Sequence, residues 1–176
     1  MLKLYKLFIF LFFNFLLSGD VVESNEKIPN VKLKSLDNKK FELLEVCKDS
    51  YVLFNFWNMS CEPCKKEMKF LNEFHEQYSD FGFKVVSINI DQPRSMAKVK
   101  KYVKSSKYSF EVFQDPSQQV FKKMGGSIMP FVVIADNKNV IINKHIGYNP
   151  GDEKALKEEI ETLISFEKDT VINEAK

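Results

Sequence analysis

The chain has 176 residues, of which 44% are hydrophobic and 28% are charged. This balance is typical of a globular protein with enough chain for one domain and its core, and it excludes a disordered or fibrous protein. The formal net charge is only +2. Electrostatic attraction to nucleic acid is therefore not indicated, and no nucleic-acid partner is expected.

The N-terminus has the pattern of an export signal. Two lysines make it basic, and a mostly apolar run follows over residues 7–17, which is short for a membrane-spanning helix of about 20 residues. A large residue, Leu17, stands where cleavage after Gly19 would favour a small one, so an uncleaved anchor stays open. We predict a signal peptide or membrane anchor over residues 1–19, an extracytoplasmic location and a linker over residues 20–30.

Apolar patterning then predicts alternating strands and helices. Strands are expected over residues 31–36, 40–43, 51–56, 84–90, 110–113, 131–135 and 140–146. Helices are expected over residues 61–78, 96–104, 118–124 and 156–163, followed by a polar, fraying tail over residues 166–176. Such alternation indicates an α/β sandwich, and the final hairpin adds an antiparallel edge to its sheet.

The motif Cys61-Glu62-Pro63-Cys64 stands between a predicted buried strand and a predicted helix. A cysteine at a helix N-terminus is favoured as a thiolate by unpaired N–H groups and the helix dipole, and the thiolate is the species that attacks disulfides. Cys64, one helical turn further on, can form or resolve a disulfide with Cys61. Pro63 suits the first turn, where its missing N–H costs nothing. The motif predicts a redox-active pair.

Two other uses of this pair stay open. A zinc site would need two more ligands, for which the chain offers Cys47, His75, His145 and acids but no second C-x-x-C. A structural disulfide that closes so small a loop would add little stability. Three roles stay open for Cys47: a third redox group, a thiol that links to a partner, or a small core residue. Both histidines fit surface or packing positions, and no metal or other cofactor is predicted.

The segment from Asn55 to Glu67 resembles the active-site segment of the TlpA/ResA-like family of exported thioredoxin-fold thiol–disulfide oxidoreductases. The resemblance covers about residues 28–165 and includes Met129-Pro130 ahead of a strand. It implies a thioredoxin fold, in which helices flank a central mixed sheet, with an N-terminal β-hairpin and a central helix–strand insertion. That domain is expected over residues 31–165.

The resemblance also implies a function. Members are exported or membrane-anchored and typically reduce disulfides, including those of apocytochromes c, with a cysteine pair that faces a cis-proline. It therefore implies Cys61 and Cys64 as the catalytic pair, disulfide-containing exported proteins as substrates and a membrane-embedded thiol donor. The expected substrate-docking residues are Trp57, Ser60, Glu62, Pro63, Met129 and Pro130. Many members have Trp at position 60 and Thr at position 129, so these two departures bear on the identity of the substrate.

Glu67 is the expected third catalytic residue. It follows Cys64 by three positions and lies beside the apolar stripe of the predicted helix. A partly buried carboxyl there has a raised pKa and can take the proton of Cys64 when that thiol attacks a mixed disulfide. The position of the buried aspartate of thioredoxins holds Asn55 here, which cannot titrate. The alternative is a stripe-edge glutamate that swings to solvent.

Two functions other than disulfide reduction are compatible with a cysteine pair in such a fold. A thiol peroxidase needs Thr three residues before its reactive cysteine, where this chain has Asn58. A non-catalytic metal- or protein-binding module is the second hypothesis.

The negative charge of Glu62 disfavours a nearby thiolate, and a higher thiol pKa makes the cysteine couple more reducing. The sequence therefore favours a reductase over an oxidase.

Overall fold

A computed structural model describes residues 26–174. The predicted signal or anchor over residues 1–19, and the first part of the predicted linker, lie outside the described residues. Within residues 26–174, no helix combines the length and the apolar character that crossing a membrane requires.

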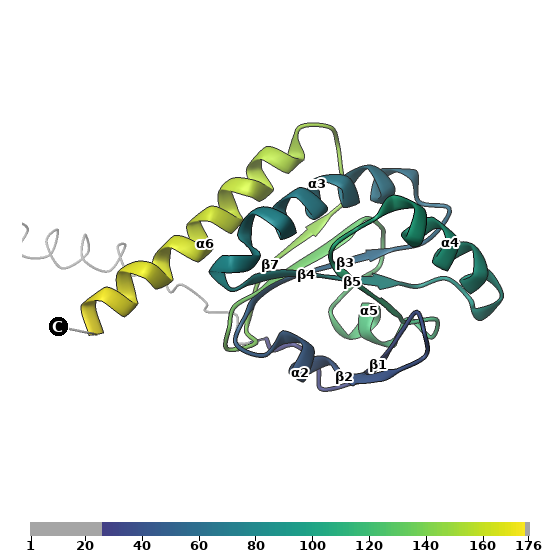
Figure 1. The fold of residues 1–176 in the computed structure, drawn as a ribbon, viewed down its shortest axis with the longest axis horizontal. Helices are drawn as coiled ribbons and strands as arrows, with labels where there is room; N and C mark the ends of the chain where they lie inside the picture. Colours follow the sequence, from purple (N-terminus) through teal and green to yellow (C-terminus); the bar gives the residue numbers. More distant parts are fainter. Residues whose placement is uncertain (1–25, 175–176) are drawn as a thin grey trace, which may run out of the picture.

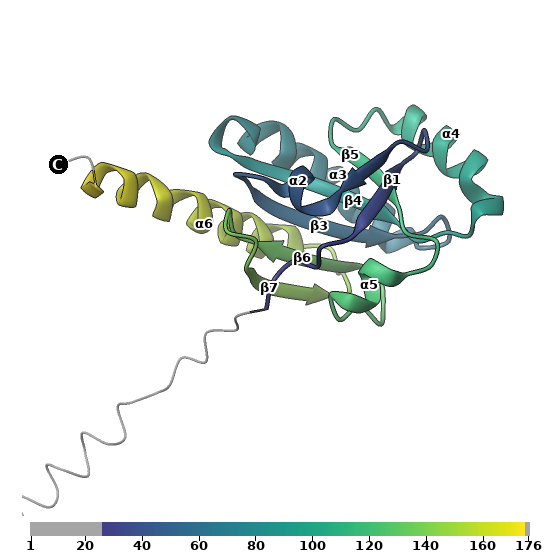
Figure 2. The ribbon, with the colours of Figure 1, turned by 90° about the horizontal axis from the view of Figure 1, so that it is seen from below.

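The described residues contain one mixed sheet of seven strands in the order β2-β1-β5-β4-β3-β6-β7. The strands are β1 (Lys32–Ser35), β2 (Lys40–Glu42), β3 (Tyr51–Trp57), β4 (Phe83–Asn89), β5 (Glu111–Gln114), β6 (Phe131–Ala135) and β7 (Ile141–Ile146). The helices are α2 (Leu43–Cys47), α3 (Glu62–Tyr78), α4 (Met96–Ser106), α5 (Gln119–Lys123) and α6 (Asp152–Glu174). Strands β3, β4 and β5 run parallel, and the other neighbours are antiparallel. The hairpin β1–β2 and the insertion of α4, β5 and α5 between β4 and β6 match the predicted architecture (Figures 1 and 2).

Strand β3 is the centre of the molecule. All seven of its residues are buried, which accounts for its nearly unbroken apolar run. Its alternate side chains serve two cores: Phe54 and Phe56 pack on the side of α2 and α5, whereas Leu53 and Trp57 pack on the side of α3 and α6. Figure 1 shows α3, α4 and α6 on one side of the sheet, with α2 and α5 on the other. The carboxyl end of β3 leads directly to the cysteine motif.

The described domain begins earlier than the sequence predicted. The predicted linker reaches residue 30, but Lys27 forms a β-bridge with Val140 and the Ile28 N–H donates to the Asn139 carbonyl at 2.9 Å. Ile28 is also buried in the core. These backbone and core contacts tie the end of the expected linker to the last hairpin.

Two helical segments also differ from the prediction. Leu43, assigned to a strand, begins the helix α2 instead, and its spacing of four from Cys47 places both residues in the core. Helix α6 continues to Glu174, through most of the segment predicted as a fraying tail. No glycine or proline follows Gly151 to interrupt that helix.

Candidate active site

The strand–turn–helix unit of β3 and α3 positions the cysteines. Strand β3 is paired on both sides, by β4 and β6, so its carboxyl end is firmly held. Cys61 is the N-cap of α3, and Pro63 lies in the first turn, where it removes no intrahelical hydrogen bond. The buried residues of α3 follow helical spacing: Cys64, Glu67, Met68, Leu71, Phe74 and Tyr78.

Cys61 and Cys64 form a disulfide, with their Cα atoms 5.3 Å apart. The two sulfur environments differ, because Cys61 is half-buried whereas Cys64 is completely buried. The backbone N–H of Cys64 donates to Cys61 Sγ at 3.2 Å. This N–H and the helix N-terminus would stabilise a thiolate on Cys61 in the reduced protein. The geometry fits Cys61 as the attacking thiol and Cys64 as the resolving thiol.

The loop before β6 lies at the same end of the sheet as the cysteine motif. The Met129–Pro130 peptide bond is cis, as the family resemblance implied. Phe131 pairs with Phe56, so continuing that antiparallel register places Pro130 across from Trp57. The Gly147 N–H donates to the Pro130 carbonyl at 2.8 Å, which ties this loop to the end of β7. Met129 is half-buried and contacts the same core cluster as Cys61.

The other expected docking residues differ in exposure. Ser60 is exposed, and its N–H and hydroxyl both donate to Asn58 Oδ1, at 3.1 and 2.8 Å. Pro63 is exposed as well. Trp57, by contrast, is completely buried and its ring centroid lies 5.5 Å from that of Tyr102. Trp57 therefore does not form the surface contact with a substrate that the sequence predicted. It packs in the core next to the site instead.

Glu62 is an exposed residue whose charge is paired. Lys65 Nζ lies 2.8 Å from Glu62 Oε1, and this hydrogen bond lowers the pKa of the carboxyl. The same ammonium lies 5.6 Å from the ring centroid of Tyr102. The positive charge of Lys65 offsets part of the effect that Glu62 was expected to have on the pKa of Cys61.

Glu67 is buried, with only 4% of its surface exposed, so the alternative of a glutamate that swings to solvent is wrong. It lies one helical turn beyond Cys64 on the same buried face of α3. Burial raises the pKa of its carboxyl to about 8, and the nearby charge of Asp152 adds to the increase. Its Oε2 atom has no hydrogen-bond partner among the described residues. This carboxyl can hold or accept a proton near neutral pH.

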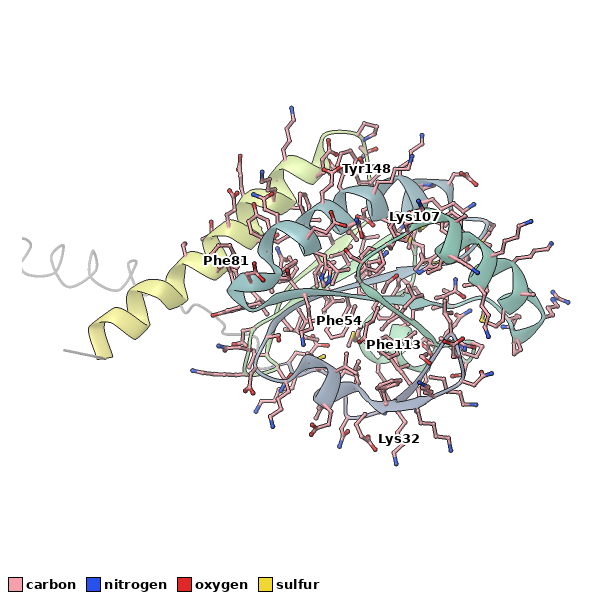
Figure 3. The ribbon with its side chains drawn as sticks, in the orientation of Figure 1. Lys32, Phe54, Phe81, Lys107, Phe113 and Tyr148 are labelled. Atoms are coloured by element: carbon pink, nitrogen blue, oxygen red, sulfur yellow. A yellow bond between two sulfur atoms is a disulfide. The ribbon has the colours of Figure 1, made fainter. Side chains whose placement is uncertain are left out.

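A cavity of about 320 Å³ separates α3 from the end of β7 and the start of α6. Its lining includes Glu67, Phe70 and Leu71 of α3, together with Tyr148, Asp152 and Leu156. Figure 3 labels Tyr148 in the segment that joins β7 to α6, beside α3. The tyrosine hydroxyl donates to Glu153 Oε2 at 2.9 Å, and its ring centroid lies 6.4 Å from that of Phe70.

Cys47 belongs to the core rather than to this site. It is fully buried in the cluster on the opposite face of the sheet from Cys64. Burial raises the pKa of its thiol to about 12, so it resists forming a thiolate. This environment fits the packing interpretation of Cys47.

The two histidines take separate structural positions. His75 Nδ1 accepts the Val85 N–H at 3.1 Å, and His145 Nε2 lies 2.7 Å from Glu159 Oε2. Within residues 26–174, no group of three or more His, Cys, Asp or Glu side chains is placed to hold a metal ion.

Sequence reasoning missed three residues near the site: Lys65, Tyr148 and Asp152. Lys65 carried a signal, because it follows Glu62 by three positions on a helix. The Asn149-Pro150-Gly151 run signals a turn, and an acidic residue directly after it signals a helix start. Nothing in the sequence showed that this turn would lie against Glu67.

Comparison with known proteins identifies the family. The model of the AhpC/TSA family matches residues 24–146. The chain belongs to this family. Thiol-disulfide oxidoreductase ResA from Bacillus anthracis is 27% identical over 137 residues, which cover 78% of each chain. ResA from Halalkalibacterium halodurans is 25% identical over 154 residues, covering 88% of this chain and 84% of that protein.

A solved structure agrees with these relatives. A Chlorobium tepidum protein described as a thiol:disulfide interchange protein DsbE superposes with a TM-score of 0.72 and 26% identity, covering 80% of this chain and 97% of that one. The predicted thioredoxin fold and TlpA/ResA-like family are thereby confirmed. The chain is a thiol–disulfide oxidoreductase, and the Cys61–Cys64 disulfide lies at the helix start where that chemistry is expected.

Proposed function

We propose that this protein reduces disulfides of exported proteins, apocytochromes c among them, with Cys61 as the attacking thiol and Cys64 as the resolving thiol. The observation that carries the proposal is the unequal burial of the two sulfurs at the start of α3. A substrate can reach half-buried Cys61, whereas Cys64 can reach only its partner cysteine or a sulfur already bound there. The dithiol and its disulfide need no cofactor.

The proposed cycle moves two electrons. The Cys61 thiolate attacks one sulfur of a substrate disulfide, which forms a mixed disulfide and releases the other substrate sulfur as a thiolate. The Cys64 thiol gives its proton to the Glu67 carboxylate and attacks Cys61 Sγ. The Cys61–Cys64 disulfide forms, and the second substrate sulfur leaves. A membrane-embedded thiol donor then returns two electrons and restores the dithiol.

The pKa of Glu67 suits a base for this step. A carboxyl with a pKa of about 8 is close in proton affinity to an ordinary thiol, so the proton moves between them at little cost in free energy. A fully exposed glutamate would hold the proton far less well. Resolution should accordingly speed up as the pH rises and Glu67 becomes ionised.

The surface around Cys61 supports an extended peptide as substrate. Ser60 and Ile128 are exposed, and Met129 is half-buried in the cis-proline loop. None of these three side chains carries a charge, and the charge of neighbouring Glu62 is paired with Lys65. An uncharged or apolar segment next to the substrate cysteine can therefore approach them without losing ionic solvation. Main-chain groups beside Met129 can pair with such a segment.

Cysteine trapping tests the division of labour. Cys64→Ser should accumulate mixed disulfides with substrate proteins, because attack proceeds while resolution fails, and Cys61→Ser should trap almost none. Wild-type protein should reduce insulin disulfides in the presence of a thiol donor, without bound zinc or copper and without appreciable peroxide turnover. Equal trapping by both variants would refute the assignment. Stoichiometric metal with no disulfide reduction would favour the binding-module alternative.

The proposed location has its own test. A fusion of residues 1–30 to a reporter that is active only outside the cytoplasm should give signal if the basic start and the apolar run direct export. The matched control carries two charged residues within the apolar run. If the unaltered fusion is stable but its reporter stays inactive, the extracytoplasmic proposal is contradicted.

A further inference from the structure

The cavity beside Glu67 extends from the buried carboxyl to the surface of the molecule. Exposed residues of α6, Asp152 and Ala155, share its lining with buried Glu67, so the cavity joins the interior to the surface. Figure 1 shows α6 running alongside α3, with the segment before α6 folded over toward α3. The exposed residues Asp152 and Ala155 give the cavity an opening at the start of α6, and its lining includes no residue of the Cys61–Cys64 motif.

Asp152 is fixed at this opening. It is the first residue of α6, and its Oδ2 atom accepts the backbone N–H of Asn149 at 2.7 Å. The N-terminus of a long helix favours a negative charge at that position. The carboxylate therefore has a defined place from which to act on Glu67.

Besides Asp152, the cavity is lined by other charged or titratable groups. Those groups are Lys144 and His145 from β7, Tyr148 from the following segment, and Glu153 from α6. They have partners of their own: Lys144 with Glu26 at 2.7 Å, His145 with Glu159 at 2.7 Å, and Tyr148 with Glu153 at 2.9 Å. Among the described residues, Asp152 and Glu153 of this lining form no salt bridge with a cation, and Asp152 accepts only neutral N–H groups of Asn149. Of the two, Asp152 is the one whose charge acts on Glu67.

We propose that this cavity is the route by which Glu67 exchanges its proton with solvent, and that Asp152 at the opening is a positioning residue that favours the protonated form of Glu67. The inference rests on the proposed role of Glu67 as the base for Cys64. After resolution Glu67 carries the proton of the Cys64 thiol. That proton passes to water in the cavity and then to bulk solvent, which regenerates the carboxylate.

Asp152→Asn tests the electrostatic half of the proposal, because it removes the charge and keeps an oxygen for the Asn149 N–H. Titration of the Glu67 carboxyl in the oxidised full-length chain, followed by carbon-13 NMR, should show a midpoint lowered by roughly half a pH unit or more. Glu158→Gln, an exposed change of the same charge on the same helix, should leave the midpoint unchanged. Asp152→Ser gives a second neutral variant. An unmoved midpoint in both Asp152 variants would overturn this half.

Ala155→Met tests the route, because it adds bulk to the cavity lining on a helix that tolerates methionine. Single-turnover reduction of a model disulfide should show resolution slowed by roughly threefold or more while attack by Cys61 is unchanged. Ala97→Met, on the exposed face of α4, should resolve at the wild-type rate. Unchanged resolution in Ala155→Met would overturn the route.

Glu67→Gln separates this inference from the proposed function. If Glu67→Gln slows resolution while Ala155→Met does not and the Asp152 variants leave the Glu67 midpoint unmoved, the base assignment stands and the cavity proposal fails. If Glu67→Gln itself resolves normally, the role of Glu67 fails first. In the Glu67→Gln background, Asp152→Asn should have no further effect on resolution. A persisting effect there would show that Asp152 acts on the fold instead.

Discussion

Replacing Glu67 by Gln should change how the stability of the protein depends on pH. Glutamine keeps the shape of the protonated carboxyl but cannot ionise. The pKa of Glu67 rises from an ordinary 4.5 to about 8 in the folded protein, with burial as the main cause. Between these two pH values the folded chain holds a proton that the unfolded chain has lost. The free energy of unfolding of the wild type therefore falls as the pH rises through that window, relative to the variant.

The magnitude follows from linkage. One proton of difference corresponds to a slope of about 1.4 kcal/mol per pH unit across the middle of the window. From 4.5 to about 8, this amounts to at most roughly 5 kcal/mol in favour of Glu67→Gln at pH 9. Near pH 4.5 the two proteins should differ by only about 1 kcal/mol, because both then carry a neutral side chain at this position.

Urea unfolding of the oxidised chain at several pH values measures the effect. Fluorescence of Trp57, which is the single tryptophan and completely buried, reports the transition. The oxidised form is used so that neither catalytic thiol titrates. Glu73→Gln, an exposed change on the same helix, should give a curve parallel to the wild type. If the wild type and Glu67→Gln also ran parallel between pH 5 and 8, the raised pKa would be refuted.

Other predictions concern neighbouring groups. Burial lowers the pKa of His75 from 6.5, so the wild type should lose stability relative to His75→Gln as the pH falls below 6.5, which acid-side urea titrations measure. Cys47→Ala should cost about 1 kcal/mol in unfolding free energy and leave insulin reduction unchanged, because the thiol only packs in the core. Lys65→Met should raise the pKa of Cys61, measured by thiolate absorbance, because the charge of Glu62 then stands uncompensated. A Cys61 pKa that stays the same or falls would show that Lys65 does not act on the thiolate.

The sequence predicted the catalytic strand and helix well because their signals are local. An apolar run interrupted only by Asn55 marks a strand buried on both faces, and the spacing of Cys64, Leu71 and Phe74 marks one face of a helix. The same spacing predicted that Glu67 would lie at the buried face. The family resemblance, and not the pattern, supplied the cis bond before Pro130.

The features that could not be predicted from the sequence depend on tertiary contacts. The segment from Leu43 to Cys47 forms a helix because Leu43 and Cys47 both reach the core, and five residues are too few to show a clear period. The β-bridge of Lys27 to Val140 joins residues more than a hundred positions apart. The position of Asp152 near Glu67 likewise follows from how α6 packs on α3, which no local pattern reveals.

Electrons and protons would use different openings in the proposed cycle. A substrate bound over Cys61 and Met129 covers the edge of the sheet where Cys61 lies, and it stays there until Cys64 resolves the mixed disulfide. Glu67 receives its proton at that same moment, one helical turn further into α3. An exit through the substrate surface would then be closed. A cavity that opens at the start of α6 lets Glu67 lose its proton while the substrate is still bound, so proton release need not wait for product release.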